Sequence, residues 1–317
     1  MSLLDLAVFF FITASFFQKK WDRKSAIWYL KTFTPFIAVA LLSLIFQLPF
    51  LPLLKIGISS LYLLRFIFYS LLLLIILNQP QFKNKLLLFL WMMGMSIVVV
   101  GLLQYFLYPN LRNLAYLGWD PHEFRLFSTF LDPNFTGIIL VLTLILGCLY
   151  IYPSFLKWRW VIVFSLFFNV LALLLTYSRG SFMALFAVLL AGGVFKKKYW
   201  QTLLRILLLT IFIFLLPRPN GEGVNLFRTL SISSRLENNA EAWDLFLTSP
   251  IFGVGFDKLR FTRILPDTSA DNEFELNHSS AGFHNSWLFI LATSGLLGLA
   301  SYLWIWYRLN AAANPKF

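Results

Sequence analysis

The sequence has little charge and almost no cysteine. Only 13% of its 317 residues are charged and 59% are hydrophobic, whereas a soluble domain carries about a quarter charged residues. This composition, with a mean hydropathy of +0.75, argues against a soluble fold. The single cysteine, Cys148, lies in an apolar run, which leaves no disulfide framework and no thiolate metal site. Acidic residues are scarce as well, 14 against 26 Lys and Arg.

Several motifs that carry common chemistries are also missing. The chain has no Walker A loop, no Gly-x-Gly-x-x-Gly, no Cys/His metal spacing and no nucleophile elbow. We therefore predict no metal and no cofactor. The net charge of +12 does not indicate nucleic acid, because Lys and Arg accumulate in the cytoplasmic loops of a membrane protein. Apolar residues 3–17 are followed, not preceded, by a basic cluster, which is the reverse of a signal peptide.

Long apolar runs are what the sequence has in abundance. Nine of them are about 15–23 residues long, the length needed to cross a ~30 Å hydrocarbon core. We therefore predict an all-α polytopic membrane helix bundle that forms a single integral membrane domain over residues 1–317. The predicted spanning segments are 3–17, 33–54, 56–77, 86–107, 135–152, 158–176, 181–195, 200–216 and 285–307.

Basic residues follow alternate segments, and this pattern predicts the orientation. The positive-inside rule places these basic connections in the cytoplasm. The N-terminus and the connections 108–134, 176–181 and 217–283 are then predicted to lie outside. The basic connections contain Lys19, Lys20, Arg23 and Lys24; Lys83 and Lys85; Lys157 and Arg159; Lys196–Lys198; and Arg308 and Lys316.

The long outer loop, 217–283, contains the signature of a helix. Ser234 and Glu237 fit a capping box, with Ser234 as the N-cap, and Pro250 is expected to end the helix. Arg235 would then lie in the first turn. A helix N-terminus and a guanidinium that converge there would favour a phosphate.

Two polar clusters on the predicted outer side carry candidate chemistry. Arg179 lies in Thr176-Tyr-Ser178-Arg-Gly-Ser181, either as an interfacial side chain that snorkels or as a phosphate ligand assisted by the hydroxyl of Ser178. His284 is followed by Asn285 and a helix start. It is either a satisfied interfacial histidine or a base that accepts a proton from a sugar hydroxyl.

Two further arginines have open interpretations. Arg125 lies in the outer 108–134 loop, where it contacts a phosphate or a sugar, or pairs with Asp132. Asn134 is predicted to cap the helix that follows. Arg65 is deep in the 56–77 segment, where a cation faces the bundle interior or a wet cavity. It either closes a structural ion pair or forms the inner wall of a donor site.

Four segments together resemble the O-antigen ligase and polymerase superfamily of bacterial membrane glycosyltransferases. Their order, spacing and common outward placement carry the resemblance, which covers about residues 120–300. The segments are Arg125…Asp132-Pro-Asn134…Gly137, Thr176-Tyr-Ser178-Arg179-Gly180, Arg235…Trp243…Pro250-Ile-Phe-Gly253-Val-Gly255, and His284-Asn285…Gly295-Leu-Leu-Gly298.

The resemblance implies a GT-C-like fold in the bacterial cytoplasmic (inner) membrane, with the active face outside the cytoplasm. It implies transfer of a sugar or oligosaccharide from an undecaprenyl-diphosphate-linked donor to a hydroxyl on a glycan or lipid-linked acceptor, in surface polysaccharide assembly. Arg179 and Arg235 correspond to the family's diphosphate-binding arginines and His284 to its catalytic histidine. We expect an inverting transfer without a metal, because the arginines supply the positive charge.

Two alternatives stay open from the sequence. Relatives in the superfamily include proposed inorganic-carbon transporters, and a transporter would place polar groups near the bilayer midplane. Family members usually have about a dozen helices, so nine segments indicate a shortened member. A shortened, non-catalytic member of an export complex is therefore the other alternative. The outward polar clusters favour the transferase.

Overall fold

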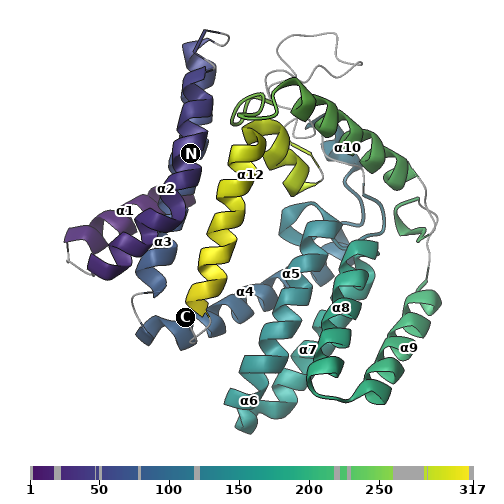
Figure 1. Cartoon of the computed structure of the whole chain (residues 1–317). Helices are drawn as coiled ribbons and strands as arrows, with labels where there is room; N and C mark the ends of the chain where they lie inside the picture. The colour runs from purple at the N-terminus through teal and green to yellow at the C-terminus, as the bar shows by residue number, and fades with distance from the viewer. Residues whose placement is uncertain are drawn as a thin grey trace. The chain divides into compact units, whose positions relative to one another are not determined.

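The computed structural model is helical throughout (Figure 1), with 84% helix and no strand in the part of the chain that it describes. It describes residues 3–17, 23–46, 48–49, 52–77, 80–117, 122–217, 222–226, 230–259, 282–283 and 285–313. The main helices are α1 (Leu3–Phe17), α2 (Arg23–Phe46), α3 (Leu53–Leu77), α4 (Pro80–Leu107), α5 (Pro133–Leu146), α7 (Arg159–Leu175), α8 (Arg179–Phe195), α9 (Tyr199–Leu215), α10 (Leu230–Thr248) and α12 (Ser286–Ala313).

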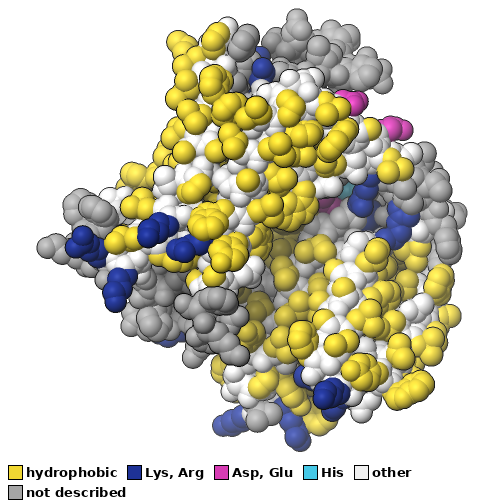
Figure 2. Space-filling model, in the orientation of Figure 1, with side chains coloured by type: hydrophobic (Ala, Val, Ile, Leu, Met, Phe, Trp, Pro, Cys, Tyr) yellow, Lys and Arg dark blue, Asp and Glu magenta, His cyan; other side chains and the backbone are white. Residues whose placement is uncertain are grey.

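The helices agree with the predicted all-α membrane architecture. Each predicted spanning segment overlaps a helix, and five helices in the described ranges are long and apolar enough to cross a bilayer. The apolar helices α1, α7, α8 and α9 are shorter, so the count of nine spans stays a prediction. Figure 2 shows hydrophobic side chains spread widely over the face in view, with Lys and Arg gathered in a few groups. Such a surface suits a lipid environment.

Two predicted helix boundaries were wrong. The segment predicted at 33–54 is α2, which begins at Arg23, contains Pro35 and ends at Phe46; the prolines at 49 and 52 lie beyond it, where they cannot interrupt its hydrogen bonds. Helix α10 lies where the outer-loop helix was predicted, but it begins at Leu230. Ser234 and Glu237 therefore lie inside α10 and do not form its N-cap.

The chain divides into two compact units. The first contains residues 1–83 and 230–317, and the second contains residues 84–229. Buried aromatic side chains of α2 pack with Leu74 of α3 and Ile305 of α12 in the first unit. Leucines of α5 and α7 form the main core of the second unit with Val98 of α4 and Leu185 of α8. That the whole chain is one membrane domain stays a prediction.

Arg65 closes a structural ion pair in the first unit. Its Nε lies 3.0 Å from Oδ1 of Asp5, which also accepts a hydrogen bond from the Tyr69 hydroxyl at 3.2 Å. Asp5 is 5% exposed, so its carboxylate needs a cation nearby. The pair joins α1 to α3, and it confirms the first of the two predicted roles for Arg65.

Helix α12 is two helices joined by a sharp break, visible near the top of Figure 1. Gly295 has φ 66° and ψ −166°, a conformation that is accessible essentially only to glycine. The segment predicted as one span at 285–307 is therefore helical but not continuous. Residues 296–313 alone extend about 27 Å, nearly the thickness of a ~30 Å hydrocarbon core.

The loop after α10 satisfies the backbone groups that the break exposes. Val254 N and Gly255 N donate to the carbonyls of Ala292 and Thr293 at 2.9 and 3.0 Å. In return, Leu296 N and Leu297 N donate to the carbonyls of Pro250 and Ile251 at 2.9 and 3.3 Å. Buried backbone groups must be paired in this way, so the loop and the break form one interlocked element.

Candidate anion site at the start of α5 and α8

Helix α8 begins at a polar turn that its sequence builds locally. The backbone of Ser178 is extended, and its hydroxyl oxygen accepts a hydrogen bond from Ser181 N at 3.4 Å, so it is the N-cap of α8. Arg179 is the first residue of the helix. Its backbone N–H therefore belongs to the first turn, at the positive end of the helix dipole.

Helix α5 begins next to this turn. The Ser178 hydroxyl donates to Oδ1 of Asn134 at 3.0 Å, and the Ser181 hydroxyl lies 3.4 Å from the Asn134 carbonyl oxygen, which accepts its hydrogen bond. A Cβ added at Gly137 would lie 2.2 Å from Oγ of Ser181, so this close approach requires glycine. Two helix N-termini therefore meet at one place, and each favours negative charge.

The cap of α5 is Asp132, not Asn134 as predicted. Oδ1 of Asp132 accepts hydrogen bonds from Asn134 N at 2.7 Å and Phe135 N at 3.4 Å, and Pro133 occupies the first helical position. A carboxylate is favoured beside helix N–H groups, and proline suits the first position because it has no N–H. The Asn134 side chain is thereby released to bind Ser178.

Arg125 is buried beneath the joined helix starts, with 3% of its surface exposed. Its Nε donates to the Thr176 carbonyl at 2.9 Å and its Nη2 donates to Oδ1 of Asn134 at 3.4 Å. Both acceptors are neutral oxygens, so these contacts orient the guanidinium without cancelling its charge. Arg125 adds a fixed positive charge to the site and ties the loop before α5 to the turn before α8.

Arg179 is half-buried and faces the loop after α9. Its Nη1 donates to the Leu226 carbonyl at 3.3 Å. The planar guanidinium carries further N–H donors that suit phosphate oxygens in a bidentate pair. We call Arg125, Asn134, Ser178, Arg179 and Ser181 the α5/α8 site.

Backbone strain gathers around the α5/α8 site. Four residues that are not glycine have φ between 48° and 56° there, and such conformations cost of order 1–3 kcal/mol each. Tyr177 is one of them; it is fully buried, and its hydroxyl donates to the Pro217 carbonyl. Strain of this kind is typical of functional sites. The four residues are Phe124, Ser128, Leu131 and Tyr177.

The other predicted site residues belong to the first unit or lie outside the described residues. Arg235 is exposed near the start of α10. Oδ1 of Asn285 accepts hydrogen bonds from Trp287 N at 3.0 Å and Leu288 N at 3.4 Å, so Asn285 caps the first part of α12. His284 lies outside the described residues. That Arg179, Arg235 and His284 share a pocket stays a prediction.

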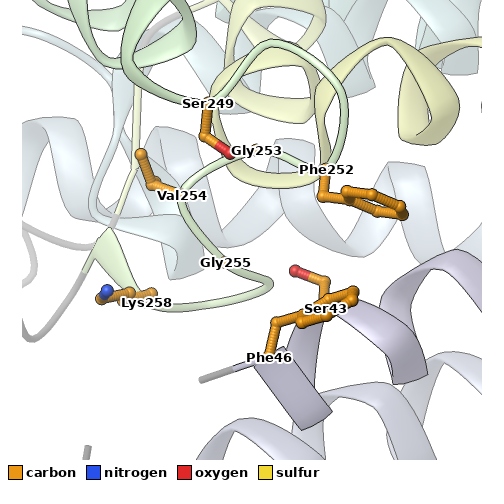
Figure 3. Close-up of a pocket in the computed structure, with 8 residues that line it drawn as sticks. All are labelled: Ser43, Phe46, Ser249, Phe252, Gly253, Val254, Gly255 and Lys258. Atoms are coloured by element: carbon orange, nitrogen blue, oxygen red, sulfur yellow. The ribbon is translucent and has the colours of Figure 1, made fainter. Parts of the chain in front are cut away.

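A separate cavity of about 440 Å³ lies within the first unit, between the end of α2 and the loop after α10 (Figure 3). Phe46 and Phe252 meet at its edge with ring centroids 5.2 Å apart. Ser43 lies at its base, where its hydroxyl accepts a hydrogen bond from Phe256 N at 2.8 Å. Lys258 is the one cation among its eight lining residues, whereas the α5/α8 site contains two arginines.

Residues 164–303 match the protein-family model described as O-antigen ligase. The resemblance to the O-antigen ligase superfamily is confirmed. The O-antigen ligase match includes Ser178, Arg179 and Arg235, and it supports a membrane function of the ligase or polymerase type with a lipid-linked glycan substrate. Neither the curated proteins nor the solved structures include a significant match to the chain.

Sequence reasoning missed part of the α5/α8 site. Asp132 and Ser181 were visible in the sequence, but the role of Asn134 as a bridge between helices depends on two helices that meet in space. The carbonyl of Thr176 that holds Arg125 carries no sequence signal at all. The pairing of Asp with Pro at 132–133 was the available signal for the true cap, because Pro favours the first helical position.

Proposed function

We propose that the chain transfers a sugar or oligosaccharide from a polyprenyl-diphosphate-linked donor to a hydroxyl of a glycan or lipid-linked acceptor. The observation that carries this proposal is the α5/α8 site, where two helix N-termini meet, Arg179 is the first residue of α8, and the buried guanidinium of Arg125 lies beneath them on Asn134. Such an arrangement favours a dianionic group. In this reaction the dianionic group is the diphosphate of the donor.

Positive charge at this site would accelerate the transfer by stabilising the leaving group. The bond between the anomeric carbon and the diphosphate oxygen breaks, and the electron pair goes to the diphosphate. Negative charge therefore grows on the oxygens beside Arg179 as the bond breaks, and a guanidinium already in place lowers the barrier. The Ser178 hydroxyl, which donates to Oδ1 of Asn134, would redirect that hydrogen bond to a diphosphate oxygen.

The acceptor hydroxyl would attack the anomeric carbon from the face opposite the diphosphate, which inverts the configuration. The hydroxyl must lose its proton, and His284 would accept it, because a neutral imidazole is a competent base near neutral pH. Arg235 would supply a second guanidinium to the diphosphate. Arginines that neutralise the diphosphate fill the role that a divalent metal has in other transferases, so we propose transfer without a metal.

The transport alternative predicts a polar site near the bilayer midplane. Arg65 lies deep in a predicted span, and its ion pair with Asp5 accounts for it. The polar groups that gather in the second unit lie at helix ends, where a transferase needs them. We therefore favour the transferase over the transporter.

The test is a transfer assay on the full chain in nanodiscs, with an undecaprenyl-diphosphate-linked glycan as the donor, a glycan acceptor, and EDTA in one arm. Removal of one charge-stabilising donor typically costs 10²–10³ in kcat. Arg179→Ala is expected to lower kcat by about a hundredfold or more, and EDTA is expected to leave transfer unchanged. His284→Ala is expected to abolish it.

Arg112→Ala is the matched control. Arg112 is also an arginine of the second unit, but its Nε pairs with Oε1 of Glu123 at 2.5 Å on the surface, outside the α5/α8 site. Its removal is expected to leave transfer within about twofold of the unaltered chain, since exposed pairs contribute little. Equal activity of the Arg179→Ala and Arg112→Ala variants would contradict the proposal. Solute uptake by liposomes that contain the unaltered chain would favour the transporter.

A further inference from the structure

An apolar groove of about 470 Å³ lies among α7, α8 and α9 in the second unit. Helices α8 and α9 run side by side in Figure 1. Phe167 and Leu174 line the groove from α7, while Arg205, Leu208 and Phe212 line it from α9. The lining positions on α7 and on α9 recur every three or four residues, so each of these two helices presents one continuous stripe to the groove, while α8 contributes Leu189.

The groove extends along most of α9. From Arg205 to Leu216 its wall extends about 16 Å along the helix direction, close to half of a ~30 Å hydrocarbon core. Apart from Arg205, every side chain that lines it is apolar. Water would find no hydrogen-bond partners along the apolar walls of such a groove, whereas a hydrocarbon chain would bury its apolar surface there.

One end of the groove meets the α5/α8 site. Leu174 lies one turn before Ser178, and the hydroxyl of Tyr177 donates to the carbonyl of Pro217, the residue after the lining Leu216. Leu226, whose carbonyl accepts the hydrogen bond from Arg179, packs against the same apolar cluster as Leu174 and Leu216. An anion at Arg179 with an attached chain therefore has an apolar path that leads directly away from it.

The opposite end is marked by Arg205. Side chains of a helix lean toward its N-terminus, so the Arg205 guanidinium is directed along α9 toward the turn of Lys196–Lys198. Its aliphatic stem can extend the apolar wall while the charge lies nearer the helix end, as interfacial arginines do. At the other end of the groove, the starts of α5 and α8 meet and direct N–H groups at an anion, which is why we assign the anionic head to the α5/α8 end.

We propose that this groove holds the prenyl chain of the donor whose diphosphate lies at Arg179. The inference rests on the proposed function and extends it from the head of the donor to its lipid tail. It predicts that binding energy comes from two separable parts: the charge at the α5/α8 site and the apolar contact along α7 and α9. A change in the groove should therefore affect only ligands that carry a chain.

The experiment measures binding of two probes to the full chain in nanodiscs: undecaprenyl diphosphate and inorganic diphosphate. Leu208→Trp would fill the groove, and Leu207→Trp is its matched control, because Leu207 is an exposed leucine of the same helix that does not line the groove. Leu208→Trp is expected to raise the Kd of undecaprenyl diphosphate about tenfold and to leave that of inorganic diphosphate unchanged. Leu207→Trp is expected to change neither.

The outcomes separate this inference from the proposed function. Arg179→Ala should weaken the binding of both probes. If it weakens the binding of neither, the proposed function fails. If Arg179→Ala weakens both but the two tryptophan variants bind undecaprenyl diphosphate equally, the head site stands and the groove assignment is wrong. A different outcome is that phosphatidylglycerol displaces undecaprenyl diphosphate from the unaltered chain but not from the Arg205→Gln variant. That result would overturn the assignment in favour of a phospholipid.

A measurement on the unaltered chain tests the groove assignment even if a variant fails to fold. A photoreactive undecaprenyl diphosphate analogue, with its reactive group in the chain, is expected to label α7 or α9 residues that line the groove. Excess undecaprenyl diphosphate should suppress this labelling. Labelling confined to other helices would contradict the assignment, even where every variant is unstable.

Discussion

Replacement of Gly295 by alanine adds one methyl group at the break in α12. The added Cβ would lie 2.2 Å from the carbonyl oxygen of Ile251 and 2.7 Å from Gly253 N. These are backbone atoms of the interlocked loop, so they cannot rotate away. The φ of 66° at Gly295 also excludes alanine without strain. We therefore expect the loop and the two parts of α12 to separate.

The expected loss of stability in Gly295→Ala has two contributions. A non-glycine residue in this conformation costs about 1–3 kcal/mol. Separation also weakens the hydrogen bonds from Leu296 N and Leu297 N to the loop, each with a net contribution of about 1 kcal/mol. We expect Gly295→Ala to destabilise the first unit by about 3–5 kcal/mol.

The assay is thermal unfolding of the full chain in detergent, followed by tryptophan fluorescence. Gly57→Ala is the matched control in the same unit, because Gly57 is helical and a Cβ there meets nothing within 4 Å. Alanine is favoured over glycine in a helix by up to about 1 kcal/mol, so the control should not lower Tm. Equal Tm values for Gly295→Ala and Gly57→Ala would refute the interlock.

Four further predictions concern the ion pair and the α5/α8 site. Arg125→Lys should lower Tm and the free energy of unfolding, the latter by about 2–3 kcal/mol, because lysine cannot reproduce two hydrogen bonds from one planar fork. An unchanged Tm would show that the buried guanidinium does not hold the loop before α5 to the turn before α8. Arg65→Gln should destabilise the first unit by about 1–3 kcal/mol, and adding Asp5→Asn should recover part of this loss in a double-mutant cycle; simple additivity would count against the pair. Gly137→Ala should force α5 and α8 apart and abolish transfer. Gly180→Ala should leave Tm unchanged, since a Cβ there meets nothing within 4 Å, but should weaken donor binding if the diphosphate approaches that backbone.

The helices were predictable because their signal is local. Apolar runs long enough for a bilayer identify them without any tertiary information, and Ser178 before Arg179 is a strong cap signal. The joined starts of α5 and α8 were only partly predictable. The sequence placed Arg125, Ser178 and Arg179 in outer connections, but it carried no signal that Asn134 would bridge two helices.

The break at Gly295 could not be predicted for a similar reason. Glycine is frequent in membrane helices, so Gly295-Leu-Leu-Gly298 fits a continuous span. What makes a break tolerable is the hydrogen bonding from residues 250–255, which lie some forty positions earlier in the chain. Both glycine-containing motifs were visible in the sequence as part of the family resemblance, but their mutual contact is a property of the fold.

The central claim is that the α5/α8 site binds the diphosphate of a lipid-linked donor. The most direct measurement is an experimental structure of the full chain in nanodiscs with undecaprenyl diphosphate bound. We predict the diphosphate within hydrogen-bond distance of the Arg179 guanidinium and the Ser178 hydroxyl. A diphosphate bound elsewhere, with these two side chains unoccupied, would contradict the account.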